Sequence, residues 1–220
     1  MSVLVVVGTG TDVGKTHVTV ALLTEARARG LSVAAYKPVA TGVVERCGDA
    51  ARHAEALGAP YVAPSFAYAR PVSPHLAARE EGRPVELALV RARAAELGAG
   101  MDLLVVEGAG GLFSPLGPAL TNVDLVRALD PDAVALVAPD RLGVLHDVGA
   151  ARAGARARGM RSPLVVLSAP EVEDEATGSN AAELDLLGLG PVVACFPRAA
   201  SGEAATRAAA AAMLEAILAR

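Results

Sequence analysis

The chain has 220 residues, of which 53% are hydrophobic, 20% are charged and 3% are aromatic, and its formal net charge is −4. This composition is typical of a packed globular protein with an aliphatic core, and it excludes a disordered or fibrous chain. The negative balance argues against a general nucleic-acid binder. No apolar run approaches the roughly 18 residues of a membrane span, and Cys47 and Cys195 form no metal-binding or disulfide pattern. We therefore expect a cytoplasmic protein that binds neither nucleic acid nor a membrane.

Short apolar runs alternate with helical stretches along the chain. In chain order we expect strand 2–7, helix 15–29, strand 32–36, helix 49–57, helix 75–81, helix 84–97, strand 101–106, helix 122–129, strand 133–138, helix 144–158, strands 164–167 and 192–196, and helix 202–219. Pro84 suits the first turn of its helix. The strands lack inside–outside alternation, which indicates a parallel sheet covered on both faces. We predict an α/β fold with a doubly wound, mostly parallel sheet, in a single domain spanning residues 1–220.

The turn after the first strand carries the strongest motif, Gly8-Thr9-Gly10-Thr11-Asp12-Val13-Gly14-Lys15-Thr16. Its G-K-T end matches a phosphate-binding loop, in which backbone amides at a helix N-terminus cradle phosphates, the Lys neutralises them and the Thr hydroxyl binds Mg²⁺. The first glycine of the usual pattern is replaced by Thr9, with Gly8 and Gly10 on either side. The alternatives are a plain Gly-rich turn or a dinucleotide loop. The GxGxxxG spacing and the G-K-T end favour a nucleoside triphosphate site.

Lysine is rare in this chain: of the 20 basic residues only Lys15 and Lys37 are lysines. A lysine that persists in such an arginine-rich composition is expected where a compact ammonium works and a planar guanidinium does not. Lys37 ends the second strand, and Pro38 holds it in an extended conformation. The carboxyl ends of strands line the binding crevice of open α/β sheets. Both lysines are therefore predicted to be functional, with an exposed edge lysine as the alternative for Lys37.

Two carboxylates are candidate metal ligands. Glu107 follows strand 101–106 and opens the segment Glu107-Gly108-Ala109-Gly110-Gly111, whose small residues allow a backbone to approach a ligand closely. A carboxylate at a strand end beside a phosphate loop is well placed for a metal ion. The alternative is an exposed Glu in a Gly-rich turn. Asp49 opens a helix, where an acid can also serve as a favourable cap.

The chain resembles the dethiobiotin synthetase family in five motifs, which are G-T-G-T-D-V-G-K-T, Y-K-P-V-A-T-G, C-G-D-A, V-S-P-H and V-E-G-A-G-G-L-F-S-P-L. Their order and spacing match over about residues 2–147. The resemblance implies a P-loop NTPase-like fold and an ATP- and Mg²⁺-dependent ligase of biotin biosynthesis. Such enzymes convert 7,8-diaminopelargonic acid and CO₂ into dethiobiotin, ADP and phosphate, through a carbamate and a mixed anhydride. The family is typically homodimeric.

The resemblance also implies roles for the residues at matching positions. The catalytic residues would be Lys37, Lys15 and Thr11. The nucleotide would be bound by Asp12, Val13, Gly14, Lys15, Thr16, His17, Asp49, Glu107, Gly108, Ala109, Gly110, Pro197, Arg198 and Ala199. The Mg²⁺ ligands would be Thr16, Asp49 and Glu107. The substrate would be bound by Thr41, Leu142, Gly143 and His146.

The chain departs from the family where the nucleotide base is read. Family members that select adenine often have Asn-Asp where this chain has Ser168-Ala169-Pro170, so binding of triphosphates other than ATP stays open. Two rival functions differ from this chain in their sequence features. Nucleotide-switch ATPases of the partitioning or division-site type carry a signature lysine at the position of Gly10. Amide ligases of the cobyrinic acid type usually carry an extra glutaminase domain, for which 220 residues leave no room.

Overall fold

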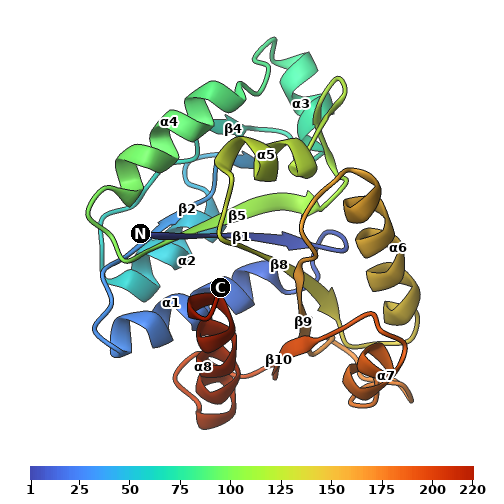
Figure 1. The fold of residues 1–220 in the computed structure, drawn as a ribbon. Helices are drawn as coiled ribbons and strands as arrows, with labels where there is room; N and C mark the ends of the chain where they lie inside the picture. Colours follow the sequence, from blue (N-terminus) through green and yellow to red (C-terminus); the bar gives the residue numbers. More distant parts are fainter.

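A six-stranded parallel sheet forms the centre of the computed structural model, which describes residues 1–220 (Figure 1). Its strands are β1 (Ser2–Gly8), β2 (Val33–Tyr36), β5 (Leu103–Gly111), β8 (Ala133–Pro139), β9 (Leu164–Ser168) and β10 (Val192–Phe196). Their order across the sheet is β10-β9-β8-β1-β5-β2, and every pair is parallel. In the middle, Val5 lies opposite Val106 of β5 and Val134 of β8. The predicted doubly wound parallel sheet is confirmed.

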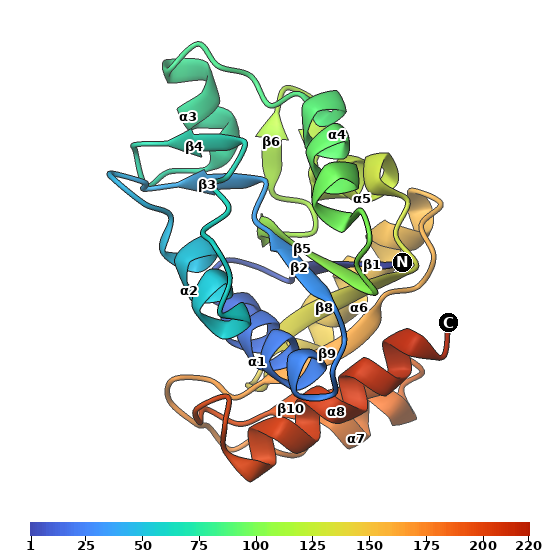
Figure 2. The ribbon, with the colours of Figure 1, turned by 90° about the vertical axis from the view of Figure 1, so that its left-hand side faces the viewer.

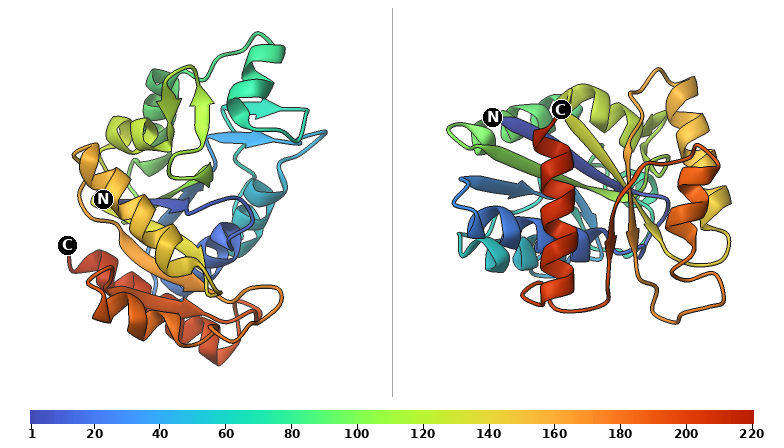
Figure 3. Two further views of the ribbon diagram at one scale, coloured as in Figure 1. Left: turned by 90° about the vertical axis from the view of Figure 1, so that its right-hand side faces the viewer. Right: turned by 60° about the horizontal axis from the view of Figure 1, so that its bottom comes forward.

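Helices cover both faces of this sheet (Figures 2 and 3). They are α1 (Lys15–Ala28), α2 (Gly48–Leu57), α3 (Pro74–Glu80), α4 (Leu87–Gly98), α5 (Asn122–Leu129), α6 (Val144–Ala157), α7 (Asn180–Leu186) and α8 (Ala204–Leu218). One buried aliphatic cluster joins the sheet to α1 and α8. A second joins the opposite face to α3, α4, α5, α6 and α7. The core is mainly aliphatic on both sides, as the low aromatic content predicts, with Tyr36, Phe66 and Tyr68 buried on one side and Phe196 on the other.

Two small sheets extend the fold beyond the carboxyl ends of β2 and β5 (Figure 2). Strands β3 (Val39–Thr41) and β4 (Phe66–Tyr68) pair in parallel, and β6 (Pro115–Gly117) and β7 (Leu120–Thr121) form an antiparallel pair. These strands are only two or three residues long, so they have no readable periodicity. Helix α7 is likewise absent from the predicted elements.

The predicted start of the fourth helix at Pro84 is wrong. Helix α4 begins at Leu87, after Glu86 in an extended conformation (φ −109°, ψ 105°). Val85, between Pro84 and Glu86, is 8% exposed and belongs to the hydrophobic core. Burying this side chain requires residues 83–86 to run as an irregular segment, which overrides the preference of Pro84 for a first helical turn.

The parallel strands all end at the same edge of the sheet, and the loops that follow them meet there. β1 lies between β5 and β8, so the chain leaves β1 toward one side of the sheet and later returns to its other side. Ligands of open α/β sheets bind at such a reversal of strand order. The two termini lie near each other on the amino side of the sheet (Figure 2). None of the helices has both the length and the apolar character needed to cross a membrane.

Candidate active site

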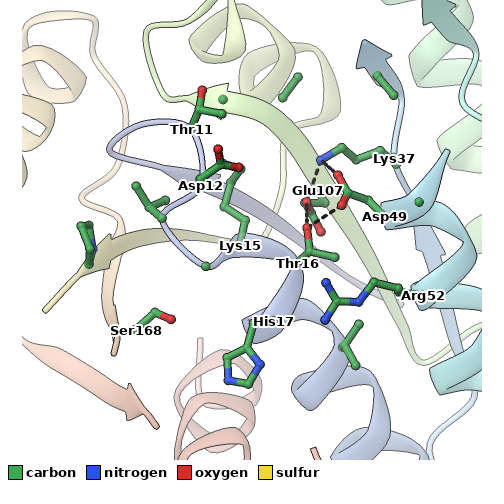
Figure 4. Close-up of a pocket in the computed structure, with 18 of the residues that line it drawn as sticks. Thr11, Asp12, Lys15, Thr16, His17, Lys37, Asp49, Arg52, Glu107 and Ser168 are labelled. Carbon is green, nitrogen blue, oxygen red and sulfur yellow. Dashed lines mark hydrogen bonds and ion pairs between the residues drawn. The ribbon is translucent and has the colours of Figure 1, made fainter. Parts of the chain in front are cut away.

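A cavity of about 1030 Å³ runs along the carboxyl edge of the sheet (Figure 4). Its walls come from the loops after β1, β2, β9 and β10, from β3 and the carboxyl ends of β5 and β8, and from the starts of α1 and α2. It collects most of the residues that the sequence predicts for the site, namely Thr11, Asp12, Val13, Gly14, Lys15, Thr16, His17, Lys37, Thr41, Asp49, Glu107, Ala109, Gly110, Arg198 and Ala199. Residues up to 188 positions apart in the chain therefore face one space.

The loop between β1 and α1 presents a helix N-terminus to this cavity. Gly14 caps α1 with φ 95°, a left-handed conformation that suits glycine, and a Cβ there would also clash with Ser168 Oγ. The Lys15 ammonium donates a hydrogen bond to the carbonyl of Gly10, 3.0 Å away. Burial, followed by the positive charge of Lys37, lowers the pKa of Lys15 to about 8. Free amides and a lysine at a helix N-terminus form a site for phosphate.

Four side chains from four elements meet beside this loop, and we call Thr16, Lys37, Asp49 and Glu107 the charged cluster. Lys37 Nζ lies 2.6 Å from Glu107 Oε1 and 2.8 Å from Asp49 Oδ2. The Thr16 hydroxyl lies 2.8 Å from Glu107 Oε1 and 3.0 Å from Asp49 Oδ1. Figure 4 shows the Thr16 hydroxyl and the Lys37 ammonium converging on the two carboxylates.

Burial and pairing keep the central ion pair charged. Glu107 is fully buried and Lys37 is 5% exposed. Burial favours the neutral form of Glu107, but the charge of Lys37 and the hydrogen bond from His53 hold its pKa well below the usual range. Burial likewise opposes the charge of Lys37, but Glu107 and Asp49 outweigh it and raise the lysine pKa. The alternatives of an exposed glutamate and an exposed edge lysine are therefore wrong, and Gly108 to Gly111 continue strand β5 rather than forming a turn.

Two polar residues at the site were missed in the sequence. His53 Nε2 lies 2.8 Å from Glu107 Oε2. It follows Asp49 by four residues on α2, and this spacing, which places both side chains on one helix face, is the signal that could have found it. Asn122 donates to the carbonyls of Ala109 and Gly111, both at 2.7 Å, and so holds the end of β5. Thr121 caps α5, and Asn122 is the first residue of that helix.

The far end of the cavity is built differently. Its walls there include Ser168, Ala169, Pro170, Arg198 and Ala199. Ser168 is the last residue of β9, and the others lie in the loops after β9 and β10. No ion pair forms among these residues, in contrast to the charged cluster. The same loops also bring Glu171 and Glu203 to the cavity, so this end carries charged side chains that form no ion pairs.

Not every predicted residue faces the cavity. Pro197 does not line the cavity, but its carbonyl lies 2.8 Å from Nε2 of His17, which does. Gly108 does not line it either, and its carbonyl lies 3.4 Å from Nζ of the lining residue Lys37.

Comparison with known proteins shows the family of this chain. A family model described as an AAA domain matches residues 2–206. The ATP-dependent dethiobiotin synthetase BioD of Caulobacter sp. (strain K31) is 43% identical over 190 residues, which cover 80% of this chain and 81% of that protein. The enzyme of the same name from Streptomyces coelicolor is 39% identical over 206 residues, covering 91% and 85%. The chain belongs to the ATP-dependent dethiobiotin synthetase family.

Solved structures agree on the fold of this dethiobiotin synthetase. The MinC:MinD cell division protein complex of Aquifex aeolicus contains a chain that is 14% identical, with a TM-score of 0.61, over 100% of this chain and 97% of that one. The signal recognition particle receptor FtsY of Elizabethkingia anophelis is 16% identical, with a TM-score of 0.54, over 96% and 64%. At these identities the likeness shows a shared fold alone. The expected ATP-dependent ligase of the P-loop NTPase-like fold is confirmed by the family membership.

The oxygen ligands available in this synthetase suit Mg²⁺. Thr16 offers a hydroxyl, and Asp49 and Glu107 offer two carboxylates. Each carboxylate has an oxygen within 3.0 Å of the Thr16 hydroxyl. The chain has no group of three or more His, Cys, Asp or Glu side chains that could hold a metal by themselves. Mg²⁺ is typically bound by one or two carboxylates, with substrate phosphates and water completing its shell. The donor set therefore fits a magnesium ion that arrives with the nucleotide.

The segment predicted to bind the substrate tail lies apart from the cavity of the synthetase. Leu142 and Gly143 immediately precede α6, and His146 lies in its first turn. All three residues are exposed, Leu142 to 74%. None of them lines the cavity. Of the predicted substrate-binding residues, a single copy of the chain brings only Thr41 to it.

Proposed function

We propose that this dethiobiotin synthetase performs its whole reaction in the cavity, with the charged cluster at the reacting atoms. The observation that carries the proposal is that both lysines of the chain and two carboxylates line one cavity at a helix N-terminus. The reaction joins two anions, a carbamate and the γ-phosphate of ATP. Their approach requires concentrated, preorganised positive charge, which is the role of such groups in phosphoryl transfer.

The proposed reaction has three steps. One amine of 7,8-diaminopelargonic acid adds to CO₂ and loses a proton, which gives a carbamate. A carbamate oxygen then attacks the γ-phosphorus of ATP, and ADP leaves, which gives a carbamic–phosphoric mixed anhydride. The second amine attacks the carbonyl carbon and loses a proton, phosphate leaves, and the five-membered cyclic urea of dethiobiotin closes. The last step is intramolecular, so correct orientation supplies much of its rate.

The residues near the phosphate loop bind the nucleotide in this proposal. The amides of Asp12 to Lys15 surround the phosphates at the N-terminus of α1, and Lys15 neutralises their charge. Ala109 and Gly110 approach the nucleotide from β5. Arg198 and Ala199 contact the base side, with Pro197 and His17 holding that wall in place.

Lys37 is the proposed catalytic cation. Its Nζ is held by Glu107 and Asp49, so it points where the carbamate and the γ-phosphate would meet. Thr16, Asp49 and Glu107 would hold Mg²⁺, which supplies charge neutralisation on the phosphoryl group being transferred. Thr11 on the phosphate loop contacts the transferred group. Thr41, where β3 ends, orients the substrate near its reacting amine.

A homodimer is part of the proposal. The exposed segment at Leu142, Gly143 and His146 supports it, because these residues lie outside the cavity of their own chain and cannot bind the substrate there. In a dimer, the same segment of a second copy binds the substrate carboxylate through the amides at its helix N-terminus. The exposure of the large apolar side chain of Leu142 agrees with such an interface.

The proposal is tested by following the carbon of CO₂. The purified chain is incubated with ATP, Mg²⁺, 7,8-diaminopelargonate and ¹³C-bicarbonate, and the products are analysed by mass spectrometry. We expect dethiobiotin with one ¹³C atom in its ureido carbonyl group. Reactions that lack the diamine are the control. Consumption of ATP with no labelled dethiobiotin would contradict the proposed function.

A further inference from the structure

His53 is a buried histidine whose place in the reaction has no explanation in the steps above. It lies in the middle of α2, one turn after Asp49, and is 3% exposed. Its Nε2 lies 2.8 Å from Glu107 Oε2, and its Nδ1 has no hydrogen-bond partner. His53 also lines a second cavity, of about 300 Å³, whose walls apart from Lys37 are formed by apolar residues such as Val33, Leu57 and Leu97. Glu107 is therefore the only polar partner of His53.

The carboxylate of Glu107 needs donors for both of its oxygens, because it is fully buried. Lys37 and Thr16 both approach Oε1, at 2.6 Å and 2.8 Å. His53 is the side chain that approaches Oε2. The two oxygens are therefore served from opposite sides. Oε1 faces the charged cluster, and Oε2 faces α2.

We propose that His53 is a positioning residue, which donates from Nε2 to Glu107 Oε2 and thereby fixes the plane of the carboxylate with Oε1 turned toward Thr16. This inference rests on the proposed function. A neutral imidazole with its proton on Nε2 satisfies Oε2 without adding a second cation to the cluster. Outer ligands of this kind orient metal-binding carboxylates.

The contact between His53 and Glu107 also restricts the position of the Lys37 ammonium. Without His53, Oε2 would be a buried acceptor with no donor, and Lys37, which already contacts Oε1, could turn toward it. Lys37 would then be drawn onto both oxygens of Glu107 and away from Asp49. With His53 in place, Lys37 contacts one oxygen of each carboxylate and stays at the side of the cluster that faces the cavity.

The test compares His53→Leu with His53→Gln in the full chain. Leu removes the donor and keeps an apolar body, whereas Gln keeps an N–H donor of similar reach. Mn²⁺ serves as the probe for Mg²⁺, and its affinity is measured by electron paramagnetic resonance in the presence of a non-hydrolysable ATP analogue. We expect about tenfold weaker Mn²⁺ binding for His53→Leu. For His53→Gln we expect recovery to within about threefold of the wild type, because the donor is restored.

His75→Leu is the matched control, because His75 hydrogen-bonds only to Ser73, at 2.9 Å, and does not line the cavity. It should leave Mn²⁺ binding unchanged. Mn²⁺ affinity in His53→Leu within about twofold of the wild type, or equal losses in the Leu and Gln variants, would overturn the proposal.

A measurement on the wild type keeps the test valid if His53→Leu does not fold. Nitrogen-15 NMR of the histidine rings should show His53 with its proton on Nε2, and an unprotonated Nε2 would overturn the proposal. The two proposals fail differently. A wild type that binds Mn²⁺ but makes no labelled dethiobiotin contradicts the proposed function, whereas labelled product with unchanged Mn²⁺ binding in His53→Leu contradicts the role of His53 alone.

Discussion

The two ends of the cavity are built on opposite principles. At the end with the charged cluster, Lys37 and Glu107 are almost fully buried, stand at or beside strand ends and form an ion pair of 2.6 Å. At the far end, which the proposed function assigns to the nucleotide base and which we call the base end, Ala169, Pro170 and Arg198 lie in loops, and Arg198 forms no ion pair. The side chains of the charged cluster are positioned by the central sheet, whereas the residues of the base end are positioned by loops between strands and helices.

Under the proposed function, the difference follows from the different tasks of the two ends. Charges that act on a phosphoryl group must be fixed before the substrate arrives, since reorienting them during the reaction would cost free energy. Buried charges are tolerated only where partners surround them. The closely paired edge of a parallel sheet supplies such partners. A nucleotide base needs only a fitting surface, so loops suffice.

The largest effect is expected at Lys37. Lys37→Ala should lower kcat about 1000-fold or more, because no other cation reaches the place where the two anions meet. Lys37→Arg should fail as well, since a planar fork of donors does not replace a compact charge between two carboxylates. The Arg variant keeps the charge that Glu107 needs, so circular dichroism is expected to show a native fold. Activity like that of the wild type in Lys37→Arg would remove the proposed distinction between the two ends.

The base end should discriminate weakly among triphosphates. Without an amide side chain at Ser168-Ala169-Pro170, a wrong base leaves few buried polar groups unpaired, and each such group is worth about 1–3 kcal/mol. We expect kcat/KM for ATP, CTP, GTP and UTP to span no more than roughly a hundredfold. A preference for ATP above roughly a thousandfold would show that backbone groups of the loop at residues 197–199 read adenine by themselves.

The proposed metal ligands should differ in importance according to their burial. The side chain of Glu107 is fully buried, whereas that of Asp49 is 39% exposed. Glu107→Gln should raise the Mg²⁺ concentration for half-maximal activity by about tenfold, and Asp49→Asn by less, because water can replace the exposed ligand. Mg²⁺ titrations of both variants at saturating ATP measure this. Unchanged titrations in both would mean that the ligands are assigned wrongly.

The smallest effect concerns Lys15 and pH. Its pKa of about 8 lies below that of a free lysine, because of burial and of the charge of Lys37. A bound phosphate favours the charged form and raises this pKa. Binding above pH 8 must therefore include uptake of a proton, so affinity falls as the pH rises. Between pH 7 and pH 8.5 we expect about a fourfold loss of affinity for a non-hydrolysable ATP analogue. Calorimetry in buffers of different ionisation enthalpy measures this uptake, and a flat profile would contradict the assignment.

The sequence was sufficient to predict that Lys15, Lys37 and Glu107 lie together, but not which residues pack around them. Lys15, Lys37 and Glu107 could be placed together because each follows or ends a buried apolar run, and parallel strands end at one edge. His53 could not be recognised by its own neighbours in the chain, since its role depends on how α2 packs against β5. The helix start predicted at Pro84 was wrong because the preference of proline for a first helical turn gave way to the burial of Val85. The distance of Leu142 from the cavity depends on tertiary structure and could not be read from any motif.

The account is tested most directly by the release of ADP from the wild-type chain. ADP release is measured with ATP and Mg²⁺ while diaminopelargonate and bicarbonate are added separately and together. The account predicts rapid release only when both are present, with one dethiobiotin formed for each ADP, because the charged cluster acts on the carbamate that the two together produce. Release of ADP at the same rate without diaminopelargonate would contradict the account and would instead indicate a nucleotide-switch ATPase.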